Sequence, residues 1–87
     1  MTQKNHENLS RLKWACRRGM LELDVLLGNF LEEAYPGLSA PEKEYFVDLL
    51  NCTDPEIFAW IMGHEKPADP HFLLITEMIR QHANSRI

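Results

Sequence analysis

The sequence predicts an all-α protein, a compact bundle of five short helices. Apolar residues recur at spacings of three and four along most of its 87 residues, as they do on the buried face of a helix. Segments 39–42 and 53–56 have the residue types that begin helices, and no alternating pattern of convincing β-strand length occurs. We therefore expect one helical domain over residues 1–87, with about 1–7 and 83–87 frayed.

The first two helices are predicted from about Asn8 to Arg17 and from about Met20 to Ala34. Gly19 is expected to end the first helix, because glycine readily takes the left-handed conformation that closes a helix. The second helix has the clearest apolar period in the chain. The residues predicted to face the core from these helices are Leu9, Leu12, Ala15, Cys16, Leu23, Leu26, Leu27, Phe30, Leu31 and Ala34.

Ser39 and Thr53 are predicted to cap the third and fourth helices, and Asp69 the fifth. The third helix should run to about Asn51, and the fourth through Met62, with Gly63 ending it. The residues predicted to be apolar core positions in these helices are Phe46, Leu49, Leu50, Ile57, Phe58, Trp60, Ile61, Met62, Phe72, Leu74, Ile75, Met78 and Ile79.

The composition excludes several classes of protein. Apolar residues make up 45% and charged residues 25%, which is typical of a globular domain. No apolar run approaches the roughly 18–20 residues of a membrane helix, and the polar N-terminus does not resemble a signal peptide. Cys16 and Cys52 are far apart, which favours two reduced thiols packed as small hydrophobes. We expect a cytoplasmic protein without membrane insertion.

The net charge of −4 is unevenly distributed. The first 18 positions hold Lys4, Arg11, Lys13, Arg17 and Arg18 beside a single acid, Glu7. A basic end on an acidic chain suits a protein partner with an acidic patch and is a weak indication of nucleic-acid binding. A solvated basic helix with Trp14 packed at its edge is the simpler interpretation of the basic segment.

The residues indicate no catalytic or metal site. His6, His64, His71 and His82 do not form the helical histidine pairs of metal motifs, and the two cysteines form no CxxC pair. Ser39 is explained as a helix cap, and neither cysteine lies in a glycine-rich elbow with an evident base. The scattered glycines exclude a phosphate-binding loop. We therefore expect no enzymatic activity.

Residues 17–22 connect the first two predicted helices with almost no linker. Arg18 and Glu22 are expected to project near one another beside Gly19, where the backbone of a partner can approach closely. The alternative interpretation is an exposed salt bridge that stabilises the fold by about 0–1 kcal/mol. The residues alone do not separate these two interpretations.

At this point the sequence resembles the succinate dehydrogenase FAD assembly factors, also called flavinators. Their RGxxE motif is matched by Arg18, Gly19 and Glu22, and the resemblance covers about residues 11–80. The other residues that carry it are Trp14 to Arg17, Leu23, Asp24, Asp54, Pro55, Phe58, Trp60, Gly63 and Lys66 to Asp69.

The resemblance implies a function that composition alone does not indicate. Members of this family bind the flavoprotein subunit of succinate dehydrogenase, and often that of fumarate reductase, and promote covalent attachment of FAD to a histidine of that subunit. It implies that Arg18, Gly19 and Glu22 form the centre of the contact surface, with Arg17 and Asp24 at its rim. We expect a monomer that binds no cofactor stably, because FAD belongs to the client protein.

Three other functions compete with this one. A regulatory interaction module, such as the antitoxin of a toxin–antitoxin pair, also predicts a helical binding domain. A nucleic-acid binder would use the basic first helix, and its affinity would fall steeply with salt. An independent enzyme has no support in the residues.

Overall fold

The computed structural model describes residues 2–86, and the side chains of residues 9–86. This part of the chain forms five α-helices and one short 3-10 helix and contains no strand. They are α1 (Thr2–Ala15), α2 (Leu21–Glu33), η1 (Tyr35–Gly37), α3 (Ala40–Leu49), α4 (Asp54–Met62) and α5 (Pro70–Ser85). The predicted all-α fold of five short helices is confirmed.

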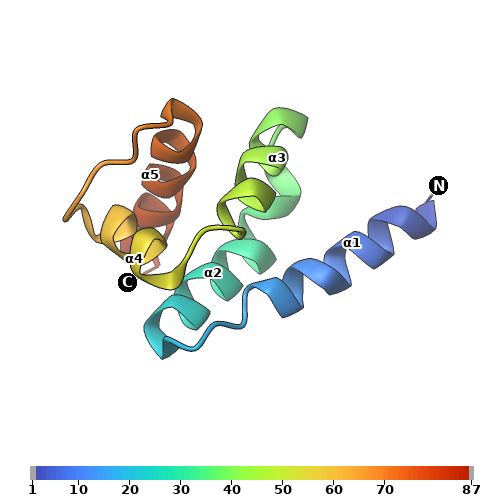
Figure 1. Cartoon of the computed structure of the whole chain (residues 1–87). Coiled ribbons are helices and arrows are strands. Elements are labelled where there is room, and N and C mark those ends of the chain that lie inside the picture. Colours follow the sequence, from blue (N-terminus) through green and yellow to red (C-terminus); the bar gives the residue numbers. More distant parts are fainter. Residues whose placement is uncertain (1, 87) are drawn as a thin grey trace.

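Helix α5 is the element around which the other helices are arranged, because it packs against α2, α3 and α4. Helix α1 packs against α2 and reaches away from the rest of the bundle toward the N-terminus (Figure 1). The molecule is accordingly longer in one direction, 39 Å against 26 Å in the other two.

Apolar side chains from all five helices meet in one core. The rings of Phe30 and Phe46, with centroids 5.4 Å apart, join α2 to α3 at its centre. The buried apolar residues are Leu12, Cys16, Leu23, Leu27, Phe30, Leu31, Phe46, Leu49, Leu50, Ile57, Ile61, Ile75 and Ile79. The stripe predicted on α2 therefore contributes Leu23, Leu27, Phe30 and Leu31 to this core.

The predicted helix starts are confirmed by their hydrogen bonds. The hydroxyl of Ser39 accepts from the amide of Glu42 at 3.3 Å, and the carboxylate of Glu42 accepts from the amide of Ser39 at 2.9 Å. Thr53 and Glu56 form the same reciprocal pair at the start of α4. Asp69 accepts from the amide of His71. Such caps satisfy amides that have no partner within the helix.

Leu9, Met62 and Leu74 were expected in the core, and each is at least 40% exposed. Conversely, Thr76 is buried although it is polar. Successive helix residues are about 100° apart, and the buried face of α5 is formed by Ile75, Thr76 and Ile79, so Leu74 lies on the side of Ile75 away from that face. The hydroxyl of Thr76 donates to the carbonyl of Phe72 at 2.7 Å, which removes the cost of burying an unpaired polar group.

The bounds of α1 differ from the prediction. The helix begins at Thr2, where the sequence indicated Asn8, and ends at Ala15, two residues before Arg17. Its end is a tight turn in which the amide of Arg17 donates to the carbonyl of Trp14 at 3.0 Å. Helix α5 continues to Ser85. Fraying of the two ends stays a prediction.

Gly63 and Gly19 were both expected to end helices in the left-handed conformation. Gly63 does so, with φ of +80° directly after α4. Within residues 2–86 it is the only residue with positive φ, so the expectation for Gly19 is wrong. Helix α1 has already ended before Gly19 is reached, and this glycine is not required by the backbone.

A polar contact on the surface joins the end of α2 to the end of α5. The carboxylate of Glu33 accepts hydrogen bonds from Nε and Nη2 of Arg86, both at 2.8 Å, and lies 2.9 Å from Nε2 of His82. The hydrogen bonds from Arg86 lower the pKa of Glu33 to about 2, and the charges of Arg86 and His82 act in the same direction.

Alanine at the two glycines should therefore have different effects. We expect Gly63→Ala to lower the free energy of unfolding by about 1–2 kcal/mol, because an L-residue is strained in the left-handed region. Its Cβ would also lie 2.7 Å from Nη1 of Arg80, which must move. Gly19→Ala, with nothing within 4 Å of its Cβ, should leave stability unchanged or slightly higher. Urea unfolding measures the stability of both variants. Equal losses of stability would contradict the conclusion that only Gly63 needs the left-handed conformation.

The stability contributed by Glu33 should depend on pH. Its pKa is lower in the folded chain than the ordinary value of 4.5, so the contribution is complete above pH 4.5 and is lost as pH falls toward about 2. Wild type should therefore lose more stability than Glu33→Gln across this range, and the difference should shrink in high salt. Urea unfolding at a series of pH values tests this, and parallel profiles would contradict it.

Candidate functional site

Three of the predicted contact residues lie in the linker between α1 and α2, and the other two lie in the first turn of α2. We call residues 16–20 the α1–α2 turn. It contains Arg17, Arg18 and Gly19, whereas Glu22 and Asp24 follow in α2. The turn crosses close to the start of α4, so segments far apart in sequence meet here (Figure 1).

The side chain of Arg18 points into the molecule and is only 13% exposed. Its Nε donates to Oδ1 of Asp54 at 2.7 Å, which forms an ion pair. Nη1 donates to the carbonyls of Ala15 and Leu50, at 2.7 and 3.0 Å, and Nη2 to that of Cys52 at 2.8 Å. Four hydrogen bonds within the chain therefore fix this guanidinium group.

The structure corrects the expected geometry of the RGxxE segment. Arg18 and Glu22 do not project together, because the arginine turns inward and the exposed glutamate points to solvent. The acid that pairs with Arg18 is Asp54 and not Glu22. Local sequence reasoning assigned Asp54 only to the start of a helix, and an ion pair spanning 36 residues leaves no local signal.

Two carboxylates hold the backbone of the turn. Oδ2 of Asp54 accepts from the amide of Gly19 at 3.2 Å, while Asp24 accepts from the amide of Arg18. Asp24 is half-buried, so it contributes to the surface only in part. The α1–α2 turn is thus fixed by acids from both α2 and α4, and its conformation does not depend on glycine-specific backbone angles.

The outer side of the turn is open. Gly19 is exposed, and a Cβ added there would meet nothing within 4 Å. Glu22 and Arg17 are exposed beside it. The guanidinium of Arg17 lies 5.4 Å from the ring centroid of Trp14, whose side chain is 72% exposed. The expectation that Trp14 packs at the edge of α1 is therefore wrong.

An apolar groove adjoins this open surface. We call it the α2–α4 groove; its lining residues are Leu21, Glu22, Val25, Leu26, Phe58 and Met62, and its volume is about 510 Å³. Local sequence patterns did not indicate this groove, because Leu26, Phe58 and Met62 were predicted to face the core, while Leu21 and Val25 belonged to no predicted face. The available signal was Leu21 and Val25, which are one helical turn apart and outside the predicted core stripe of α2.

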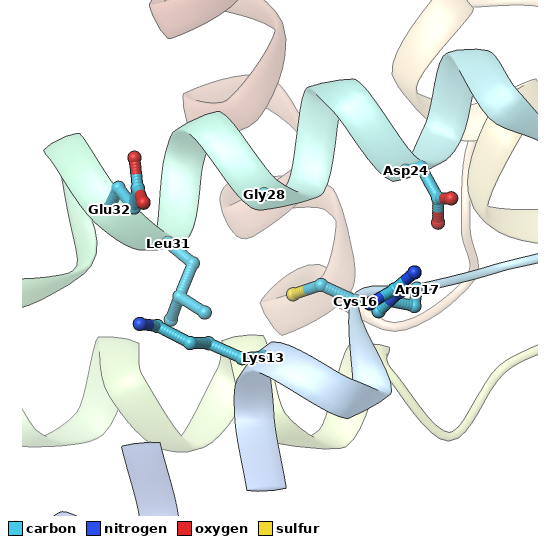
Figure 2. A pocket seen from close by; sticks show the side chains of 7 residues that line it. All are labelled: Lys13, Cys16, Arg17, Asp24, Gly28, Leu31 and Glu32. Atoms are coloured by element: carbon cyan, nitrogen blue, oxygen red, sulfur yellow. The ribbon is translucent and has the colours of Figure 1, made fainter. Parts of the chain in front are cut away.

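A smaller hollow of about 250 Å³ lies on the other side of α2, against the end of α1. Figure 2 shows Lys13 and Arg17 on one side of it, Asp24 and Glu32 on the other, and Cys16 between them. Burial raises the pKa of the Cys16 thiol to about 11. The thiol is therefore protonated near neutral pH and is a poor nucleophile.

The two cysteines are free, as the sequence predicted; Cys52 is half-buried, whereas Cys16 is buried. Among the described residues, histidine, cysteine, aspartate and glutamate nowhere gather in a group of three or more that could hold a metal ion. None of the helices in this part of the chain combines the length and apolar character needed to cross a membrane.

The chain is similar to proteins of one family over most of its length. A family model described as the flavinator of succinate dehydrogenase matches residues 10–83. A protein of Shewanella oneidensis named FAD assembly factor SdhE is 50% identical over 76 residues, which cover 87% of this chain and 93% of that protein. A protein of Idiomarina loihiensis with the same name is 54% identical over 70 residues, covering 80% and 74%.

The fold is also similar to a solved structure. The solution structure of a UPF0350 protein superposes with a TM-score of 0.79 at 43% sequence identity. The superposition covers 93% of this chain and 86% of that one. The helical arrangement and the α1–α2 turn therefore lie within the region that these proteins share.

The ion pair between Arg18 and Asp54 should contribute measurably to stability. We expect Arg18→Ala and Asp54→Ala each to lower the free energy of unfolding by about 1–3 kcal/mol, because each leaves part-buried polar groups unpaired. A double-mutant cycle should give a coupling energy of about 0.5–3 kcal/mol. Arg18→Lys should not restore stability, since a lysine lacks the planar fork that reaches three carbonyls. A coupling energy near zero would contradict this role.

Proposed function

The chain belongs to the family of flavinators of succinate dehydrogenase, and on this basis we propose that it binds the flavoprotein subunit of that enzyme and promotes covalent attachment of FAD to it. Family membership supports the flavinator role, and the structure supports docking as the means. The comparisons offer no support for the regulatory alternative.

The proposal depends on one observation, which is that the α1–α2 turn is exposed. Gly19 leaves its backbone uncovered, and Asp54 and Asp24 hold that backbone in place from beneath. A rigid, unobstructed backbone lets a partner approach closely at little entropic cost. Glu22 stands beside it as an exposed carboxylate available to a base of the client.

The contact residues have different roles in this proposal. Gly19 and Glu22 touch the client, with Arg17 at the rim. Arg18 is a positioning residue, because its guanidinium is engaged within the chain and acts through the shape of the turn. Asp24 shares this positioning role through the amide of Arg18.

The chain acts by binding, without reacting groups of its own. FAD and the flavin chemistry belong to the flavoprotein, and the chain binds no cofactor stably. By binding the arrangement of the client that is competent for flavin attachment more tightly than other arrangements, it raises the population of that state. Action on fumarate reductase, a monomeric state and a cytoplasmic location stay predictions.

Gly19→Arg should abolish most of the activity without damaging the fold. The space around Gly19 accommodates a side chain in the free protein, so the arginine should obstruct only the partner. We expect flavinylation of the purified flavoprotein subunit to slow by about tenfold or more. Covalent flavin is measured by fluorescence of the denatured client. Gly37→Arg is the matched control, because Gly37 is also exposed with nothing within 4 Å of its Cβ.

Glu22→Ala should reduce flavinylation as well, since it removes a charge from the proposed contact surface. Glu44→Ala, another exposed glutamate on α3, is its control and should behave as wild type. Circular dichroism verifies that each variant is folded. Wild-type rates from folded Gly19→Arg and Glu22→Ala proteins would refute the assignment of the surface.

A further inference from the structure

Beyond the turn itself, and resting on the proposed function, we propose that the α2–α4 groove receives an amphipathic helix of the flavoprotein client. The client helix lays apolar side chains against Leu21, Val25 and Met62 and places a lysine or arginine opposite Glu22. The groove is thus the apolar anchor of the docking surface, and its single acid selects the charge of the occupant.

The first support is the amount of apolar surface left uncovered. Leu21 and Val25 lie one turn apart on α2 and are 72% and 52% exposed, and Met62 faces them from α4 at 40%. Phe58 and Leu26 form the half-buried floor. A contiguous apolar patch with a polar border is typical of an interaction site, whereas single exposed side chains are not.

The form of the groove favours a helical occupant. Addition of a strand needs an exposed sheet edge, and residues 2–86 contain no strand. Polyproline segments dock between several aromatic rings, and this groove has only Phe58. Phosphorylated or acidic motifs require clustered arginines, and among the residues with described side chains no base lines the groove. The remaining mode of peptide recognition is a helix that lies in a groove between two helices. Such a helix has apolar side chains spaced by three and four residues.

The charge of the groove further limits the kind of partner segment that can bind there. Within residues 9–86, Glu22 is the one charged side chain that lines the groove. An anionic lipid surface would be repelled by this carboxylate, because such surfaces attract basic segments. Two copies of the chain joined groove to groove would bring one acid-bearing surface against another. A partner segment that combines apolar side chains with a lysine or arginine has the complementary pattern.

Continuity with the α1–α2 turn identifies the partner. Leu21 and Glu22 follow Gly19 by two and three residues, so the groove begins where the proposed contact at the turn ends. A specific protein interface commonly buries about 1,200–2,000 Å² in total, which exceeds what one such groove supplies. Turn and groove together form a single surface, and both are occupied by the same client.

The groove is tested by affinity for the FAD-free flavoprotein subunit, measured by calorimetry with the full chain. We expect Val25→Asp and Met62→Asp each to raise the dissociation constant by about tenfold or more, because a carboxylate would be buried against apolar side chains without a partner. Leu74→Asp is the matched control, since Leu74 is 45% exposed on α5 outside the groove, and it should change affinity by less than about twofold.

The charge of the occupant is tested at Glu22. Glu22→Lys should weaken binding more than Glu22→Gln, because it sets two like charges against each other. The difference between these two variants should shrink as salt is raised. Equal effects of the two substitutions, or tighter binding by Glu22→Lys, would overturn the proposed basic occupant.

The identity of the occupant is tested by a photo-reactive phenylalanine analogue placed at Leu21. Irradiation of the complex with the flavoprotein subunit should link it to a helical client segment that has apolar residues three and four apart and a neighbouring lysine or arginine. Links to a segment without that pattern, links between two copies of the chain, or no links in a complex that still forms would each overturn the proposal.

Failure of this inference can be told apart from failure of the proposed function. If Val25→Asp and Met62→Asp bind the client as wild type does, while Gly19→Arg loses flavinylation, the groove is not the anchor and the docking role stands. If the wild-type chain does not bind the flavoprotein subunit at all, the proposed function itself fails.

Discussion

The contact between Arg18 and Asp54 is the constraint on which the arrangement of the helices and of the candidate surface depends. The guanidinium of Arg18 binds the carboxylate of Asp54 at the start of α4 and also reaches carbonyls at the ends of α1 and α3. Another side chain could not easily make all of these contacts. Carbonyls at helix ends lack partners within their own helices. Arg18 satisfies those of two helices at once and joins the end of α1 to the segment that connects α3 with α4, more than 30 residues further along the chain.

Because Arg18 is bound to Asp54, neighbouring residues of the RGxxE motif have different roles. The arginine is directed inward by its acceptors, and the glycine that follows is left outside with its amide held by Asp54. Glu22 then lies on the exposed side of the first turn of α2. A rigid support beneath an open backbone suits a protein that works by docking, since little order must be created on binding.

The size of the domain accounts for the apolar surface beside the turn. Short helices around one small core can direct only part of their apolar side chains inward, and α2 is apolar on more than one side. Its buried stripe, which includes Leu23 and Leu27, packs against the core, while Leu21 and Val25 remain outside next to Met62. Surplus apolar surface is thereby collected at one site adjoining the α1–α2 turn, where a partner can cover it.

The sequence by itself determined the helices, the capping boxes at Ser39 and Thr53 and most of the core, because these features arise from residues three or four positions apart. Tertiary structure decided what local reasoning could not: the inward direction of Arg18, the part played by Asp54, and the different conformations of Gly19 and Gly63. The physical reason is the distance along the chain between the groups that interact. A helix cap is satisfied within one turn of chain, whereas the direction of a long charged side chain depends on acceptors that only the folded bundle brings within reach.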